Sequence, residues 1–168
     1  MRILGLDPGL RRTGWGVVDA DGDRLHFVDA GCVDVAAGTS LASRLAVLHE
    51  AVLDVTDRFS PAEAAVEEIF VNRNAASTLK LGQARGAVLL APGLRGIPVA
   101  EYAANLVKKS VSGSGHAGKE QVRAMVGVLL PGFQLASLDA ADALAVAICH
   151  SHRSRTERLW LASAGAAE

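Results

Sequence analysis

The pattern of apolar and polar positions predicts a run of strands at the start of the chain. Residues 3–6 (ILGL) carry no polar side chain, which is typical of a strand buried on both faces. A second apolar run at 15–18 predicts the next strand. Asp21-Gly22 then predicts a tight hairpin turn into a third strand over about 24–34. Three strands therefore open the fold.

Helical and strand patterns alternate in the rest of the chain. Leucines and valines recur at helical spacing over 41–55, and Ser40 is a candidate N-cap. The segment 62–70 (AEAAVEEIF) predicts a strand, and 97–102 (IPVAEY) predicts a short buried strand. Further helices are expected over about 75–90, 103–111, 119–130 and 139–152. This order predicts an α/β fold in which a mixed sheet carries helices on both faces.

The domain organisation is predicted from segments rich in glycine, serine and proline, which are typical of loops and linkers. Residues 112–118 (SGSGHAG) have the composition of a flexible joint, but no internal repeat or linker divides the chain. We therefore expect a single domain over residues 1–153. Residues 154–168 are small and polar, and we expect a C-terminal tail there that can be disordered.

Composition narrows the compartment and the possible partners. Half of the 168 residues are hydrophobic, enough for a proper core, and the apolar runs are too short to span a bilayer. Cys32 and Cys149 lack metal-ligand spacing and are interpreted as buried apolar residues in a reducing compartment. With no signal peptide expected, this indicates a cytoplasmic protein. The net charge of −1 argues against a strongly basic nucleic-acid binder, although acids dominate residues 1–70 and bases dominate 71–168.

Acidic side chains follow two of the predicted strands and interrupt one apolar helix. Asp7 ends the first strand, and Glu67 and Glu68 end the strand at 62–70; in open α/β sheets, ligands gather at such ends. Asp139 and Asp142 lie three residues apart, on one face of a largely apolar helix. Simpler interpretations exist: a turn residue before Pro-Gly, an N-cap for Asp139, and solvent exposure for one of the two glutamates.

Taken together, acids at three element ends favour a site for hard divalent cations. Such cations take oxygen ligands, and Mg²⁺ is commonly held by carboxylates, water and substrate phosphate. A pair of ions would support in-line hydrolysis of a phosphodiester. The sequence pattern alone does not choose between Glu67 and Glu68.

Four separate motifs resemble the RuvC family of bacterial Holliday junction resolvases. They read LGLDPGLRRTGWGVV, AVEEIF, NAASTLKLGQARG and DAADALAVA, in this order and spacing, and the resemblance covers residues 1–152. It implies a ribonuclease-H-like fold with a mixed five-stranded sheet flanked by helices. It also implies a homodimeric endonuclease that nicks two like-polarity strands of a four-way DNA junction symmetrically, with the branch-migration proteins RuvA and RuvB as partners.

The resemblance also assigns the acids. In the family, the metal ligands are the acid of the DPG segment, the first acid of the strand-end pair and both acids of the DAAD segment. These positions are Asp7, Glu67, Asp139 and Asp142 here. The expected cofactor is Mg²⁺, with two ions per subunit, and Mn²⁺ is a possible substitute.

Basic and aromatic residues near these motifs are candidate DNA contacts. Lys108 and Lys119 match basic positions that the family uses near the scissile phosphate, and Phe70 stands where the family presents a stacking aromatic. Without the resemblance, a solvated helix face would be an equally good interpretation of either lysine, and a core side chain would be the better interpretation of Phe70. Further candidate phosphate contacts are Arg73, Lys80, Arg85 and Lys109.

Two glycines in a predicted helix lack an explanation in the sequence. Gly82 and Gly86 each cost about 1 kcal/mol against alanine in a helix interior. Close packing of a neighbouring helix, including one across a dimer, or a DNA backbone would account for them.

Three rival functions fit the sequence less well than the resolvase. An ATP-dependent protein of the actin and sugar-kinase type shares a Gly-x-Asp-x-Gly hairpin, but it needs a second domain that 168 residues cannot supply. A RuvC-like pre-ribosomal-RNA processing nuclease shares the first motif but not the LKLGQARG and DAADALA segments. A module that binds junctions without cutting would gain nothing from four acids that repel DNA.

Overall fold

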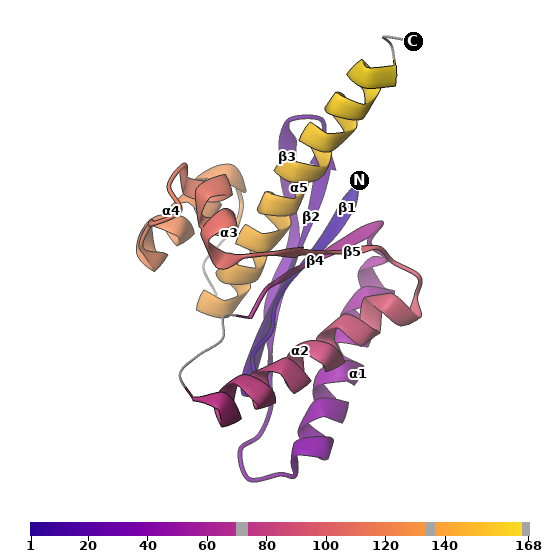
Figure 1. The fold of residues 1–168 in the computed structure, drawn as a ribbon, viewed down its shortest axis with the longest axis vertical. Helices are drawn as coiled ribbons and strands as arrows, with labels where there is room; N and C mark the ends of the chain where they lie inside the picture. The colour runs from indigo at the N-terminus through magenta and orange to yellow at the C-terminus, as the bar shows by residue number, and fades with distance from the viewer. Residues whose placement is uncertain (70–73, 134–136, 166–168) are drawn as a thin grey trace.

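A five-stranded mixed sheet forms the centre of the computed structural model, which describes residues 1–69, 74–133 and 137–165 (Figure 1). The strands are β1 Arg2–Asp7, β2 Arg12–Asp21, β3 Arg24–Asp34, β4 Glu63–Glu67 and β5 Val99–Tyr102. The helices are α1 Leu41–Phe59, α2 Ala75–Leu94, α3 Ala104–Ser112, α4 Lys119–Leu129 and α5 Leu138–Gly165. The predicted mixed sheet flanked by helices is confirmed.

The strand order β3-β2-β1-β4-β5 puts β1 in the middle of the sheet. β1 is antiparallel to β2 and parallel to β4, and β4 is parallel to β5. Three apolar side chains of β1 are completely buried, as the uninterrupted apolar run predicts: Ile3, Leu4 and Leu6. Leu6 pairs with Val66, so the residues that follow them, Asp7 and Glu67, end neighbouring parallel strands at one edge of the sheet.

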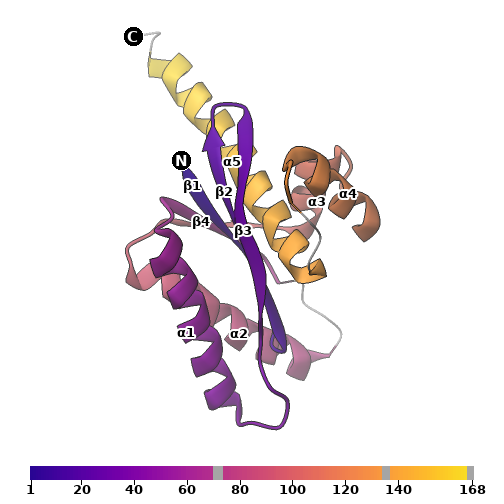
Figure 2. The same ribbon diagram turned by 180° about the vertical axis from the view of Figure 1, so that it is seen from behind.

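Helices cover both faces of the sheet, as Figures 1 and 2 show. α1 and α2 pack together on one face, and α5 crosses the other face with α3 and α4 beside it. Ser40 caps α1, since its Oγ accepts a hydrogen bond from the backbone N–H of Ser43. Each face has its own apolar core, and the α5 face contains the continuous buried run from Ala143 to Cys149.

Glycines in β1 and β2 let α5 approach the sheet closely. A Cβ at Gly5 would lie 2.2 Å from the carbonyl oxygen of Ala143, and one at Gly14 would lie 2.0 Å from that of Asp139. Both obstacles are backbone atoms of α5, so the helix could not keep its place if these residues had side chains. The first turns of α5, which contain its acids, therefore pack directly against β2 and against β1, the strand that ends in Asp7.

Two predictions about the elements need correction. β5 is only half-buried, with Glu101 exposed, because it is an edge strand and lacks a neighbour on one side. α5 continues to Gly165 and does not end near residue 152. The Thr156 hydroxyl donates to the carbonyl of His152, and Arg155 pairs with Asp23 of the β2–β3 turn. The division between a domain at 1–153 and a tail at 154–168 stays a prediction.

The two cysteines and His150 differ in how deeply they are buried. Cys149 is buried as expected, whereas Cys32 is only half-buried. His150 packs in the interior, where its Nε2–H donates to Glu63 at 2.6 Å and its Nδ1 hydrogen-bonds the Tyr102 hydroxyl at 2.8 Å. Within the described part of the chain, no helix is long and apolar enough to cross a membrane.

Candidate metal and nucleic-acid site

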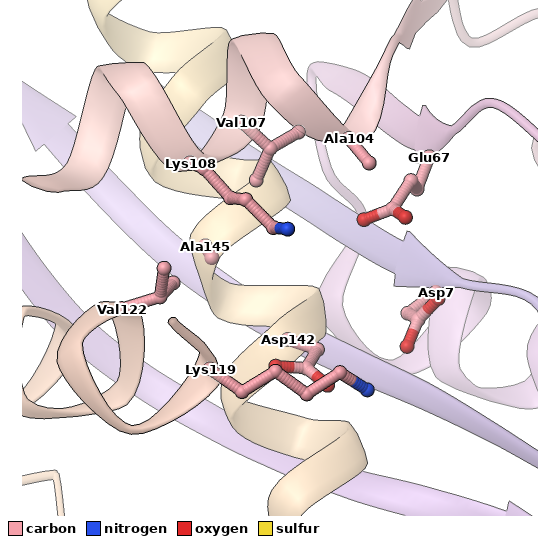
Figure 3. A pocket seen from close by; sticks show the side chains of 9 residues that line it. All are labelled: Asp7, Glu67, Ala104, Val107, Lys108, Lys119, Val122, Asp142 and Ala145. Atoms are coloured by element: carbon pink, nitrogen blue, oxygen red, sulfur yellow. The ribbon is translucent and has the colours of Figure 1, made fainter. Parts of the chain in front are cut away.

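A pocket of about 160 Å³ opens at the edge of the sheet where β1 and β4 end (Figure 3). Five elements contribute to it, namely β1, β4, α3, α4 and α5. Its lining consists of three acids, two lysines and four apolar side chains: Asp7, Glu67, Asp142, Lys108, Lys119, Ala104, Val107, Val122 and Ala145. The pocket therefore collects charged groups from positions far apart in the chain.

The strand-end acids reach the pocket because of where parallel neighbours end. Asp7 closes β1 and Glu67 closes β4, and the two strands are paired side by side. Side chains alternate between the two faces along a strand, so Glu67 lines the pocket and Glu68 is exposed. The geometry thus distinguishes two glutamates that the sequence pattern left equivalent.

The two acids of α5 have different surroundings. Asp142 lines the pocket, one turn of helix beyond Asp139. Asp139 is not part of the lining; its carboxylate lies 3.6 Å from the guanidinium of Arg12, which also pairs with Asp34 at 2.6 Å. The structure therefore brings Asp7, Glu67 and Asp142 into one pocket and leaves Asp139 at its margin, on the β2 side.

The carboxylates oppose one another's ionisation. Burial raises the pKa of Asp7 to about 7, and the negative charges of Glu67, Asp142 and Asp139 add to the effect, while Lys119 opposes it. Burial also raises the pKa of Glu67, with the charge of Asp142 as the next cause, and Lys108 and Lys119 counteract this rise. The charges of the three other predicted ligands, Asp139 included, therefore all act on Asp7.

This donor set suits a hard divalent cation. Every donor is a carboxylate oxygen, which is the ligand type that Mg²⁺ and Ca²⁺ prefer, and the shared negative charge favours a cation over protons as the pH rises. As they are placed, no three acidic, histidine or cysteine side chains of the described residues enclose an ion. Mg²⁺ in proteins usually keeps several of its waters and is bound through one or two carboxylates.

Two lysines extend into the pocket opposite the acids. Figure 3 shows the side chains of Lys108, from α3, and Lys119, from the first turn of α4, directed towards the carboxylates. Lys109, the neighbour of Lys108, is exposed and does not line the pocket. Of the three lysines around the 112–118 loop, the structure thus separates two pocket residues from one surface residue.

The remaining predicted DNA contacts lie elsewhere or outside the described residues. Lys80 is exposed on α2 and lines a separate shallow cleft beside the turn between β1 and β2. Arg85 is engaged in an ion pair with Glu101 of β5. Phe70 and Arg73 fall in the segment 70–73, which lies outside the described residues.

Sequence reasoning missed one charged residue of this site. Arg123 of α4 is 11% exposed, and its Nη2 lies 3.4 Å from Oδ2 of Asp142. The available signal was spacing, because Arg123 follows Lys119 by four residues and so shares a face of the helix with it. That spacing cannot show which acid the arginine meets, since the partner lies on another helix.

This chain is similar to a protein family, to individual relatives and to solved structures. The family model described as "Crossover junction endodeoxyribonuclease RuvC" matches residues 3–150. Curated relatives of that name include the protein of Paramagnetospirillum magneticum, 61% identical over 158 residues, which covers 94% of this chain and 95% of the relative. The protein of Xanthobacter autotrophicus is 62% identical over 152 residues and 90% of each chain.

Solved structures agree with these sequence matches. T. thermophilus RuvC in complex with Holliday junction substrate has a TM-score of 0.87 and 35% identity, covering 94% of this chain and 96% of that one. The yeast mitochondrial Holliday junction resolvase Ydc2 has a TM-score of 0.67 at 12% identity, a likeness of fold alone. The predicted ribonuclease-H-like fold is confirmed.

Proposed function

Since this chain belongs to the RuvC family of crossover junction endodeoxyribonucleases, we propose that it resolves Holliday junctions in DNA recombination and repair. It would do so by nicking two strands of like polarity symmetrically. One observation carries the proposal: Asp7, Glu67 and Asp142 come from three elements and meet in one pocket with Lys108 and Lys119. Carboxylates beside lysines are what metal-assisted hydrolysis of a phosphodiester needs.

The proposed cofactor is Mg²⁺, with two ions per subunit and Mn²⁺ as a possible substitute. Asp7, Glu67, Asp139 and Asp142 would hold it. When bound, the metal lowers the pKa of a coordinated water and neutralises charge that develops on the phosphate. The raised pKa of Asp7 supports this assignment, because a bound cation would offset both the burial of the ionised carboxylate, which is the main cause, and the repulsion from the neighbouring acids.

The lysines have two tasks in this scheme. In the free protein they offset part of the negative charge on Asp7 and Glu67. With DNA in the pocket, their ammonium groups would hold the oxygens of the scissile phosphate, as mobile point charges do well. Lys108 and Lys119 approach from two different helices, so a phosphate between them would be held from two sides.

Contacts away from the pocket are proposed with different support. Lys80 and Lys109 are exposed cations suited to DNA phosphates. Phe70 and Arg73 stay predictions from the resemblance, Phe70 as a stacking aromatic and Arg73 as a phosphate contact. Arg85 stays a prediction too, and its ion pair with Glu101 favours a structural role.

A homodimer would match a junction that is roughly two-fold symmetric. The outer face of α2 supports this proposal, because Leu79, Gly82, Gly86 and Leu90 share that face at helical spacing. Leu79 is 66% exposed and Leu90 is 50% exposed, and a Cβ at either glycine would meet no atom of the described residues within 4 Å. A second copy of the helix would cover the leucines and use the space above the glycines.

RuvA and RuvB as partners, and the cytoplasm as the location, are proposed from the family resemblance. Cys149 supports the location, since a buried free cysteine is typical of a reducing compartment.

The test is cleavage of a labelled synthetic four-way junction with a mobile core, in Mg²⁺ and in EDTA. The wild-type protein should produce paired symmetric nicks with metal only, whereas Asp7→Asn should bind the junction without cutting it. Asp54→Asn is the matched control, because Asp54 is an exposed aspartate of α1, on the opposite face of the sheet. Cleavage of structured RNA in place of the junction would support the RNA-processing alternative, and binding without cutting in every metal would support the binding module.

A further inference from the structure

Arg123 brings a buried positive charge to the wall of the candidate site. It lies one turn into α4, its side chain is 11% exposed, and its Nη2 is 3.4 Å from Oδ2 of Asp142. Its other acidic neighbour is Glu120, at 4.0 Å from Nη1, and that side chain is 99% exposed. An exposed pair at this distance contributes little, so Asp142 is the principal partner of the arginine.

The arginine differs from the other cations at this edge of the sheet. Lys108 and Lys119 carry compact ammonium groups on flexible stems, whereas a guanidinium is planar, permanently charged and rigid in its donor geometry. Arg12, which approaches Asp139, is 52% exposed and bound more closely to Asp34. Arg123 is thus more enclosed than Arg12 and than Lys119, which is exposed, and it meets a pocket acid directly.

The contact leaves half of the Asp142 carboxylate available. Arg123 engages Oδ2, and Oδ1 of Asp142 makes no hydrogen bond to any residue of the described segments. A carboxylate held by one oxygen keeps its plane and direction while the other oxygen stays free. Groups that orient a metal ligand in this way commonly change metal affinity 10- to 100-fold when removed.

We propose that Arg123 is a positioning residue that fixes the carboxylate of Asp142 in the pocket and leaves its second oxygen to a divalent cation. The inference rests on the proposed metal-dependent function and adds to it a residue that holds a ligand in place without binding the metal. The charge of Asp142 reaches Glu67, so a displaced Asp142 would also change the repulsion inside the pocket.

The test is calorimetric titration of Mn²⁺ into the protein without DNA. Arg123→Met keeps an apolar stem in the buried position and removes the guanidinium, and it should weaken Mn²⁺ binding about 10- to 100-fold. Arg123→Lys restores a charge without the rigid fork and should recover part of the loss. Glu120→Gln removes the exposed partner and should bind Mn²⁺ as the wild type does.

Junction cleavage separates positioning from general damage. At saturating Mn²⁺ the maximal rate of Arg123→Met should come within about threefold of the wild type, with the metal concentration for half-maximal rate raised as the affinity falls. A reduced maximal rate with an unchanged metal midpoint would overturn the proposal, as would unchanged Mn²⁺ affinity. Thermal unfolding in EDTA checks that each variant is folded, and Arg123→Lys decides the question if Arg123→Met is not.

Failure of this inference is distinguishable from failure of the proposed function. A wild-type protein that neither binds Mn²⁺ nor cuts the junction would refute the function. A wild type that does both, beside an Arg123→Met variant with the same affinity, would refute only the role of Arg123.

Discussion

The ionised carboxylate of Asp7 destabilises the folded protein when no metal is bound. Its pKa is raised to about 7 by burial and by neighbouring carboxylates, so ionising it costs more in the folded than in the unfolded state. Folding stability is thus reduced by the same arrangement that favours a cation. Such an exchange of stability for function is common at active sites.

Replacing Asp7 should therefore stabilise the protein while it abolishes cleavage. Between the ordinary pKa of an aspartate and about 7, the folded state binds more protons than the unfolded state, so the unfolding free energy of the wild type falls as pH rises. Asp7→Asn lacks this dependence and should be more stable by about 2 to 4 kcal/mol at pH 8. Urea unfolding in EDTA at several pH values measures the difference.

The gain in unfolding free energy of Asp7→Asn over the wild type should grow between about pH 4 and 7 and stay constant above that range. Asp54→Asn, an exposed substitution, is the control and should show no such trend. A variant no more stable than the wild type at pH 8 would show that Asp7 ionises without penalty.

Lys119 should shift the pH dependence of cleavage. Its charge lowers the pKa of both Asp7 and Glu67, so Lys119→Met should move the rise of activity with pH to higher pH values. The loss of a phosphate contact should also reduce the maximal rate about 100-fold. Rate profiles from pH 5 to 9 check this. Lys109→Met is the control, because Lys109 is the exposed lysine next to Lys108. It should weaken DNA binding and keep the wild-type dependence of the cleavage rate on pH.

At the scale of single residues, the sequence predicted a site residue only where the reason for it lies nearby in the chain. Asp142 was recognisable because an acid inside an apolar helix needs a compensating charge. The choice of Glu67 over Glu68 came only from the resemblance, because a strand-end pair shows no alternation that reveals the buried face. Arg123 was missed since its partner lies on another helix.

At the scale of elements, the seat of α5 on β1 and β2 determines where its acids stand. The helix passes within backbone contact of Gly5 and Gly14, and its buried side chains fill the core on that face. Any change that lifts α5 from the sheet moves Asp139 and Asp142 away from Asp7.

Gly5→Ala tests this dependence. The added methyl would overlap the backbone of Ala143 and Ala147, so we expect a loss of about 1 to 3 kcal/mol in unfolding free energy. Cleavage and Mn²⁺ affinity should fall beyond what the fraction of unfolded protein explains. Gly127→Ala is the control, because a methyl there meets nothing within 4 Å on the exposed side of α4. If Gly5→Ala binds Mn²⁺ with the affinity of the wild type, the position of the α5 acids does not depend on this contact.

Periodicity located the elements well and their ends less well. The turn residues Asp21-Gly22 made the β2–β3 hairpin predictable, and Ser40 marked the start of α1. The end of α5 was predicted too early because residues after His152 show no apolar stripe, although arginine and leucine still favour helix. β5 was taken as buried because sequence does not reveal that a strand lies at a sheet edge.

At the scale of the whole molecule, the outer face of α2 makes a prediction about assembly. Gly86→Arg adds a long charged side chain at a position where a Cβ would meet no atom of the described residues within 4 Å, so the subunit should fold normally. If a second copy covers this face, the variant should sediment as a monomer under conditions in which the wild type is a dimer. Its junction cleavage should then lose the pairing of nicks.

Gly127→Arg, an equally open position on α4, should leave the dimer intact. Sedimentation velocity over a range of concentrations gives both answers. A Gly86→Arg variant that stays dimeric would move the interface to another face of the molecule.

The seating of α5 also has a consequence during translation. β1 to β3 leave the ribosome well before α5, the helix that covers them and carries Asp139 and Asp142. Until then the nascent chain exposes an apolar sheet face that chaperones can recognise, and it lacks two of the four proposed ligands. We therefore expect a chain truncated before α5 to be unable to nick DNA and to be recognised by quality control, so that a ribosome that stalls early would release no active nuclease.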